Sequence, residues 1–133
     1  MTQDTPNTLR ILLVDDSEDN RKLSLRRLQK LGYSADMATD GLHALEMLAK
    51  SEYDLVLLDC EMPRMDGYAA ATEIRRREGA LKHTVVVAMT AHAADSARAK
   101  CIEAGMDDCV SKLMSLDALK SILERCRPKD SAA

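Results

Sequence analysis

The chain has 133 residues, of which 46% are hydrophobic and 31% are charged, so we expect one folded domain rather than a disordered or fibrous chain. Its formal net charge of −3 argues against a nucleic-acid partner, because nucleic-acid-binding proteins carry a basic patch or stripe. Residues 1–8 are too polar for a signal peptide and no apolar segment reaches membrane-spanning length, which predicts a cytoplasmic protein without a membrane partner.

The first predicted element is a strand over residues 9–14, LRILLV, because a strand covered on both faces carries a continuous apolar run. Two aspartates, Asp15 and Asp16, follow it directly. A helix is expected next, capped by Ser17 or Asp19. Four leucines are expected on its apolar face: Leu23, Leu25, Leu28 and Leu31.

A second strand and a second helix come next along the chain. Residues 33–37 alternate between apolar and polar, which is typical of a strand at the edge of a sheet. Asp40 is expected to cap a helix that continues to Lys50. Its apolar side would be supplied by Leu42, Leu45, Met47, Leu48 and Ala49.

The third strand, predicted over residues 54–59, is the one that the rest of the chain is built around. Its apolar run ends abruptly on Asp59. Open α/β sheets bind their ligands at the carboxyl ends of the strands, where the loops separate into a crevice. Asp59 is therefore a candidate functional residue.

The second half of the chain repeats the alternation of helix and strand. We expect helices over residues 68–77, 93–103 and 116–126, and strands over residues 84–89 and 108–111. The two strands lead to Thr90 and Lys112. Five strands alternating with five helices predict an α/β fold with a doubly wound parallel sheet, because each parallel pair needs a right-handed crossover. One domain over residues 1–133 is expected, with a core at about 9–127 and short polar tails.

The predicted strand ends bring several polar groups to one edge of the sheet. If the first and third strands are neighbours, they lie about 4.8 Å apart, so Asp15, Asp16 and Asp59 converge. Carboxylates that close repel one another, so either a cation neutralises them or one of them holds a proton. Mg²⁺ suits such a cluster better than zinc. Thr90 and Lys112 can hold the oxygens of a phosphoryl group on one carboxylate.

Other groups have ordinary interpretations. A lone aspartate at a strand end is usually a turn or capping residue, so the functional hypothesis depends on the whole set occurring together. The cysteines, at positions 60, 101, 109 and 126, form no CxxC pair, and reduced, mostly buried thiols are expected. The run of arginines at 75–77 is expected at a solvated helix end.

Taken together, these motifs resemble the receiver domains of two-component response regulators, over roughly residues 9–127. The motifs that carry the resemblance are LLVDD at 12–16, DCEMPRMDG at 59–67, MTA at 89–91 and the lysine at 112. The resemblance implies a flavodoxin-like strand order of 2-1-3-4-5. It also implies a phosphorelay function, with a sensor histidine kinase or a histidine phosphotransfer protein as the phosphohistidine partner; the downstream target stays unknown.

Specific roles follow from the same resemblance. Asp59 would accept the phosphoryl group, and Asp16 and Asp59 would bind Mg²⁺ directly. Asp15 would bind it through water, and the backbone carbonyl of Glu61 would be a further ligand. The remaining two residues of the set would bind the phosphoryl oxygens: Thr90 and Lys112.

Two alternatives and two departures from the family pattern accompany this interpretation. A metal-dependent phosphohydrolase with an aspartyl-phosphate intermediate is disfavoured because Glu61 has no substrate-covering insertion near it, and no enzyme activity is expected beyond the domain's own phosphorylation and dephosphorylation. A module that binds partners without phosphorylation is disfavoured by the intact acid set.

Cys109 stands where many relatives have an aromatic residue, and Leu113 where proline usually follows Lys112. A trans Lys112–Leu113 bond is predicted, because a cis bond before a non-proline residue costs about 2.5–4 kcal/mol.

Overall fold

Strands and helices alternate along the described chain, as the sequence predicts. The computed structural model describes residues 9–60, 67–79, 84–90, 95–112 and 114–126. The strands are β1 (Ile11–Val14), β2 (Ala35–Ala38), β3 (Leu55–Asp59), β4 (Val85–Thr90) and β5 (Asp108–Ser111). The helices are α1 (Glu18–Lys30), α2 (Gly41–Lys50), α3 (Gly67–Glu78), α4 (Asp95–Glu103) and α5 (Leu116–Cys126). None of these helices, within the described ranges, has the length and apolar character needed to cross a membrane.

The strands form one parallel sheet in the order β2-β1-β3-β4-β5, which confirms the predicted flavodoxin-like order. The central strand is β3, and it lies between β1 and β4. Asp59, the last residue of β3, lies opposite Met89 in β4. Thr90 is the next residue of β4, and Asp15 follows the end of β1. The chain therefore delivers Asp15, Asp59 and Thr90 to the same carboxyl edge of the sheet.

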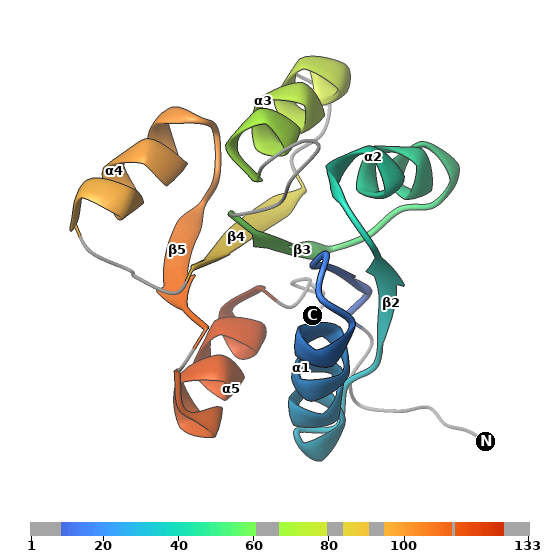
Figure 1. Cartoon of the computed structure of the whole chain (residues 1–133), viewed down its shortest axis with the longest axis vertical. Coiled ribbons are helices and arrows are strands. Elements are labelled where there is room, and N and C mark those ends of the chain that lie inside the picture. The colour runs from blue at the N-terminus through green and yellow to red at the C-terminus, as the bar shows by residue number, and fades with distance from the viewer. Residues whose placement is uncertain (1–8, 61–66, 80–83, 91–94, 113, 127–133) are drawn as a thin grey trace, which may run out of the picture.

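Helices cover both faces of the sheet, with α1 and α5 on one face and α2, α3 and α4 on the other (Figure 1). Side chains of the strands alternate between the two faces, so each central strand contributes to two apolar clusters. The cluster against α1 and α5 includes Ile11, Leu13, Leu55, Leu57, Val87 and Leu123. The cluster on the other face includes Leu12, Val14, Val56, Leu58, Ile74 and Val86. Burial on both faces explains why these strands are unbroken apolar runs.

Local signals set the ends of the first two helices where the sequence predicts them. Ser17 Oγ accepts a hydrogen bond from the backbone N–H of Asn20 at 3.3 Å, which makes Ser17 the cap of α1. Asp40 Oδ1 accepts one from the backbone N–H of His43 at 2.9 Å at the start of α2. After α1 the chain turns at Gly32, whose φ of 91° favours glycine.

Two leucines that we predicted on buried helix faces are exposed. Leu23 in α1 is 56% exposed and Leu42 in α2 is 43% exposed, whereas Leu28 of α1 is buried. With 3.6 residues per turn, a position five residues away lies about 140° around the helix axis. Leu23 and Leu28 therefore cannot share one apolar stripe, and the predictions for Leu23 and Leu42 are wrong.

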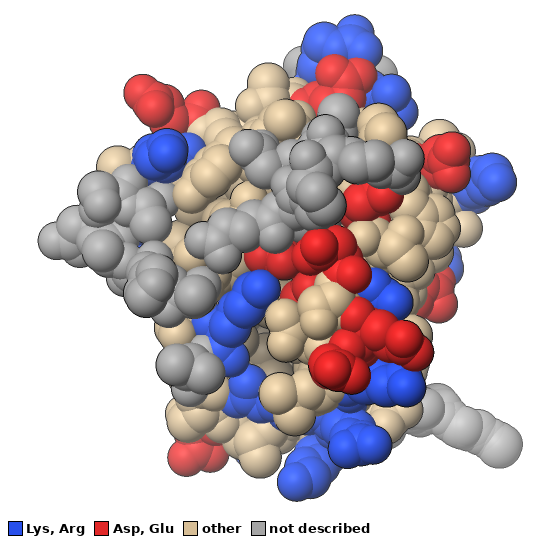
Figure 2. All heavy atoms as spheres, viewed as in Figure 1, with Lys and Arg blue, Asp and Glu red and all other residues tan. Residues whose placement is uncertain are grey.

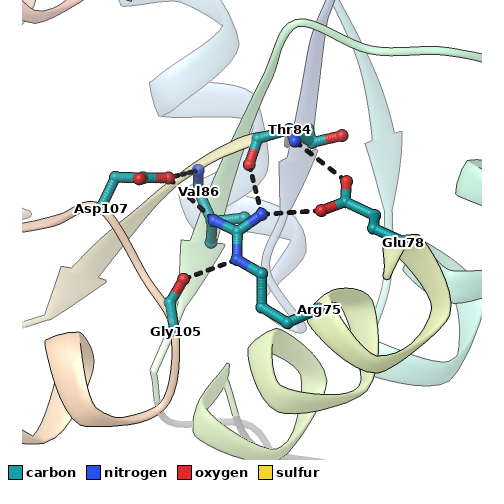
Figure 3. A network of polar contacts seen from close by, with 6 residues as sticks. All are labelled: Arg75, Glu78, Thr84, Val86, Gly105 and Asp107. Atoms are coloured by element: carbon teal, nitrogen blue, oxygen red, sulfur yellow. Dashed lines mark hydrogen bonds and ion pairs between the residues drawn. The ribbon is translucent and has the colours of Figure 1, made fainter. Parts of the chain in front are cut away.

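Arg75 ties α3 to the segments that lead into β4 and β5, at the sheet edge opposite the three aspartates (Figure 3). Its guanidinium donates to the carbonyl oxygens of Thr84 and Gly105, each at 2.7 Å. It also pairs with the carboxylates of Glu78 at 2.9 Å and Asp107 at 2.8 Å. The expectation of a solvated arginine is therefore wrong for Arg75, because its side chain folds back into a polar network and is 20% exposed.

Candidate functional site

Three carboxylates meet at the carboxyl edge of the sheet. Asp15, Asp16 and Asp59 each present an oxygen within 4.8 Å of the others. Asp15 and Asp59 are each 1% exposed, whereas Asp16 is open to solvent. In the view of Figure 2, acidic atoms gather near the middle of the molecular face, with basic atoms directly beside them. The convergence that the strand order predicted is therefore present.

Backbone contacts fix Asp15 at the turn between β1 and α1. Its Oδ1 accepts a hydrogen bond from the backbone N–H of Ser17 at 2.9 Å. Its carbonyl oxygen accepts one from the guanidinium of Arg21 at 2.7 Å, and its N–H donates to the carbonyl of Ala38 at 3.2 Å. The backbone N–H and the carbonyl of Asp15 are thus both hydrogen-bonded, and its carboxylate oxygen Oδ1 accepts a third hydrogen bond.

Lys112 reaches the carboxylates from the loop that follows β5. Its Nζ lies 3.1 Å from Asp59 Oδ1 and 3.7 Å from Asp15 Oδ2. The backbone N–H of Lys112 donates to the carbonyl of Thr90 at 2.8 Å, which ties the loop to the end of β4. A single ammonium group cannot balance three neighbouring carboxylates, so the site keeps an excess of negative charge.

Thr90 takes the position predicted for it, at the carboxyl end of β4. Thr90 ends β4, pairs with Ser111 of β5 and is 4% exposed. It directly follows Met89, the register partner of Asp59, and its carbonyl accepts the hydrogen bond from the N–H of Lys112. Glu61 and Leu113 lie outside the described residues, and so does the peptide bond between Lys112 and Leu113.

Gly67 has a role at the site that sequence reasoning did not assign. A Cβ on Gly67 would lie 2.6 Å from the carbonyl oxygen of Asp59 and 2.8 Å from the Cα of Cys60. The N–H of Gly67 also donates to the carbonyl of Cys60 at 3.2 Å. The first turn of α3 therefore packs directly on the backbone of Asp59, and only glycine leaves room for this approach. The aspartate-glycine pair at 66–67 was the available signal.

The thiol of Cys60, next to Asp59 in the sequence, is buried and protonated, and therefore unreactive. Cys60 is buried in the apolar cluster on the α2, α3 and α4 side, with its Sγ 3.9 Å from the Sγ of Cys101. Burial raises the pKa of Cys60 above its ordinary value, so the thiol stays protonated near neutral pH. Cys109, also buried, has its pKa raised to about 12, chiefly by burial. These three described cysteines are free and buried, as predicted, and they do not compete with the carboxylates as nucleophiles.

The arrangement of these groups defines a specific chemistry. Clustered carboxylate oxygens are the ligands that Mg²⁺ prefers, and the exposed Asp16 leaves the cluster accessible from solvent. An ammonium group beside Asp59 complements the charge of a group transferred to that carboxylate. The donor set therefore fits a hard divalent cation and a phosphoryl group.

Comparison with known proteins agrees with this chemistry. A family model described as the response regulator receiver domain matches residues 11–124. The chain belongs to the response regulator receiver domain family, whose members serve two-component and phosphorelay signalling.

Several relatives illustrate the match. The sensor histidine kinase RcsC of Salmonella typhi is 43% identical over 122 residues, which are 92% of this chain and 13% of the kinase. The receiver domain of the sensor histidine kinase PA1611 from Pseudomonas aeruginosa is 36% identical, with a TM-score of 0.78 over 88% of this chain and 95% of that one. That structure holds a magnesium ion in its active site cleft. The response regulator TrrA of Thermotoga maritima, solved with Mg²⁺ and a beryllium fluoride, is 34% identical, with a TM-score of 0.78 over 90% and 99% of the two chains.

The chain thus corresponds to a small part of the curated kinases that it matches. It spans 13% of RcsC from Salmonella typhi and 7% of the hybrid signal transduction protein dokA from Dictyostelium discoideum. The similarity is to their receiver portions, and neither a phosphohydrolase nor a phosphorylation-independent module finds support in these matches.

Proposed function

We propose that this chain is one phosphoacceptor receiver domain, over residues 1–133, and that Asp59 accepts a phosphoryl group from a phosphohistidine. The observation that carries this proposal is that Asp59 lies within the acidic cluster while its Oδ1 is 3.1 Å from the ammonium of Lys112. Lys112 lies farther from Asp15, at 3.7 Å from its Oδ2, and Asp15 Oδ1 accepts a hydrogen bond from the backbone N–H of Ser17. The shorter distance between the ammonium and Asp59 favours Asp59 as the acceptor.

The proposed reaction is an in-line displacement at phosphorus. A carboxylate oxygen of Asp59 forms a bond to phosphorus while the bond from phosphorus to the histidine nitrogen breaks, and the imidazole leaves with a proton from solvent. Lys112 and Thr90 stabilise the phosphoryl oxygens as charge moves onto them. The product is an acyl phosphate, which adds a charge of about −1.5 to −2 at this edge of the sheet. Slow hydrolysis of this bond by water would return the domain to its resting state.

Mg²⁺ is the cofactor proposed for this site, and when bound it would neutralise charge on the transferring group. Asp16 and Asp59 are proposed as direct ligands, with the backbone carbonyl of Glu61 as a third. Asp15 is proposed to act through water. The hydrogen bond from the backbone N–H of Ser17 occupies Asp15 Oδ1 and supports this division.

Substitutions at the two neighbouring aspartates test this division. Asp16→Ala is expected to weaken Mg²⁺ binding by about 100-fold, because a direct ligand is lost, and Asp15→Ala by about tenfold, because an outer partner is lost. Titration of each variant with Mg²⁺, followed by amide chemical shifts, gives the two dissociation constants. A larger loss for Asp15→Ala than for Asp16→Ala would show that the direct ligand is misassigned.

The phosphodonor is proposed to be a sensor histidine kinase or a histidine phosphotransfer protein. The relatives that support this include proteins named as a sensor histidine kinase and as a hybrid signal transduction histidine kinase.

Intact-protein mass spectrometry tests the proposed function. Incubation with Mg²⁺ and acetyl phosphate is expected to add one phosphoryl group to the chain, and chelation of Mg²⁺ by EDTA is expected to prevent it. Acetyl phosphate tests the site without needing the cognate kinase, because it carries the same kind of labile phosphoryl group. A chain that binds Mg²⁺ and gains no mass would contradict the proposal and favour a module that acts without phosphorylation.

A further inference from the structure

Lys112 depends on its loop for its position. Its side chain reaches Asp59 from beyond the end of β5, so a shift of the loop backbone moves the ammonium directly. The backbone N–H of Lys112 is anchored to the carbonyl of Thr90 at 2.8 Å. The backbone N–H of Met114 donates to the carbonyl of Ser111 at 3.1 Å, and the carbonyl oxygen of Lys112 also accepts a hydrogen bond, from another element of the fold.

A residue of α1 supplies that hydrogen bond. Arg27 Nη1 donates to the carbonyl oxygen of Lys112 at 3.4 Å, and Arg27 Nη2 donates to the carbonyl oxygen of Met114. The two carbonyls flank position 113, so the guanidinium spans the loop just after the lysine. A guanidinium presents its donors in a rigid planar fork, which suits two fixed acceptors better than a single ammonium does.

The surroundings of Arg27 support a dedicated contact. Within the described part of the chain, both of its hydrogen-bond acceptors are loop carbonyls. Its side chain lines the same pocket as Asp15, Lys112 and Met114, between α1 and the loop. The neighbouring Arg26 carries the same charge, but it lies on a different side of the helix and is exposed. Position on the helix, and not basic charge alone, therefore brings Arg27 to the loop.

We infer that Arg27 is a positioning residue. It holds the loop after β5 against α1, so that the amine of Lys112 stays beside the Asp59 carboxylate. The inference rests on the proposed function, because it concerns the lysine that would bind the transferred phosphoryl group. Within the described residues, the hydrogen bonds of Arg27 go to loop carbonyls and not to the three carboxylates. Its loss should therefore impair phosphoryl transfer while leaving the metal ligands in place.

Arg27→Ala is expected to slow phosphorylation by acetyl phosphate by between about tenfold and 100-fold, because a displacement of about 1 Å at a reacting centre can cost that much. Affinity for beryllofluoride, a mimic of the phosphoryl group, should fall in the same variant. Mg²⁺ affinity should stay within about twofold, because the hydrogen bonds of Arg27 go to loop carbonyls and not to the proposed metal ligands or their hydrogen-bond partners. Arg27→Lys should recover part of the rate, since an ammonium can bind one of the two carbonyls.

Arg26→Ala is the matched control, because it removes the same charge from the adjacent position of α1 and should keep the wild-type rate. Thermal unfolding of each variant checks that the fold is retained. If Arg27→Ala does not fold, the phosphorylation rate and the two affinities are measured on Arg27→Lys instead. A wild-type rate in Arg27→Ala, or equal losses of Mg²⁺ and beryllofluoride affinity, would overturn the inference. If the wild-type chain gains no phosphoryl group at all, the proposed function fails instead.

Discussion

Asp59→Asn is expected to reduce phosphorylation by acetyl phosphate below detection, while the wild-type chain gains one phosphoryl group. The substitution keeps the shape of the side chain but replaces the carboxylate with an amide, which is not a competent nucleophile toward phosphorus. Intact-protein mass spectrometry under identical Mg²⁺ concentrations measures the difference. Equal labelling of the variant and the wild type would place the phosphoryl group on another residue.

Two controls accompany this substitution. Asp117→Asn removes an exposed carboxylate from the first turn of α5 and should leave labelling unchanged. The fold of Asp59→Asn should persist, because neutralising one of three carboxylates that lie within 4.8 Å of one another relieves repulsion. Its unfolding temperature without Mg²⁺ is therefore expected at or above that of the wild type, which separates lost chemistry from lost structure.

Gly67→Ala should have the second large effect, on both stability and phosphorylation. The added Cβ would lie 2.6 Å from the carbonyl oxygen of Asp59, and backbone atoms cannot move aside as a flexible side chain would. Overpacking of this kind typically costs about 1–3 kcal/mol of stability. Because the clash falls on Asp59 itself, the phosphorylation rate should fall by up to about 100-fold. Urea unfolding and the rate of acetyl phosphate labelling measure the two effects.

Gly79→Ala is the control for this glycine. A Cβ on Gly79 meets no atom within 4 Å, but its φ of 63° makes alanine strained there by roughly 1–2 kcal/mol. Stability should therefore fall in both variants, whereas the phosphorylation rate should fall only for Gly67→Ala. Equal rates in the two alanine variants would mean that the packing of α3 against Asp59 does not position the carboxylate.

Much of the fold follows from local sequence. The unbroken apolar run that ends on Asp59 predicts a doubly covered strand, and β3 is buried throughout. Polar residues in the right places, such as Ser17 and Asp40, predict the helix starts because they satisfy backbone N–H groups. The strand order is less local, because pairing depends on distant segments, and it was expected from the family resemblance rather than from the residues alone.

Much of the candidate site could also be predicted, since each polar residue follows a recognisable strand. Asp15, Asp16 and Asp59 converge once β1 and β3 are neighbours, and Lys112 reaches them from the loop after β5. The roles of these residues in metal binding and phosphoryl transfer stay predictions. The backbone ligand at Glu61 also stays a prediction, because it lies outside the described residues.

Residues whose roles depend on contacts between distant segments escaped prediction. Arg27 and Arg26 are indistinguishable in the sequence, and only the packing of α1 beside the Lys112 loop brings one of them to its carbonyls. Arg75 similarly appeared as one of three solvated arginines, yet it lies in a network with residues near β4 and β5. The spacing of the leucines in α1 misled for Leu23, because Leu23 lies about 140° around the helix axis from the buried Leu28.

The most direct test of the central claim is to locate the phosphoryl group on the chain. Borohydride delivers hydride to the carbonyl carbon of an acyl phosphate, releases phosphate and leaves an alcohol, so a phosphorylated aspartate becomes homoserine. After labelling with Mg²⁺ and acetyl phosphate, reduction and peptide mass spectrometry should find homoserine at position 59 and unmodified aspartate at positions 15 and 16. Homoserine at position 15 or 16, or labelled protein that yields no homoserine, would contradict the assignment of Asp59 as the phosphoacceptor.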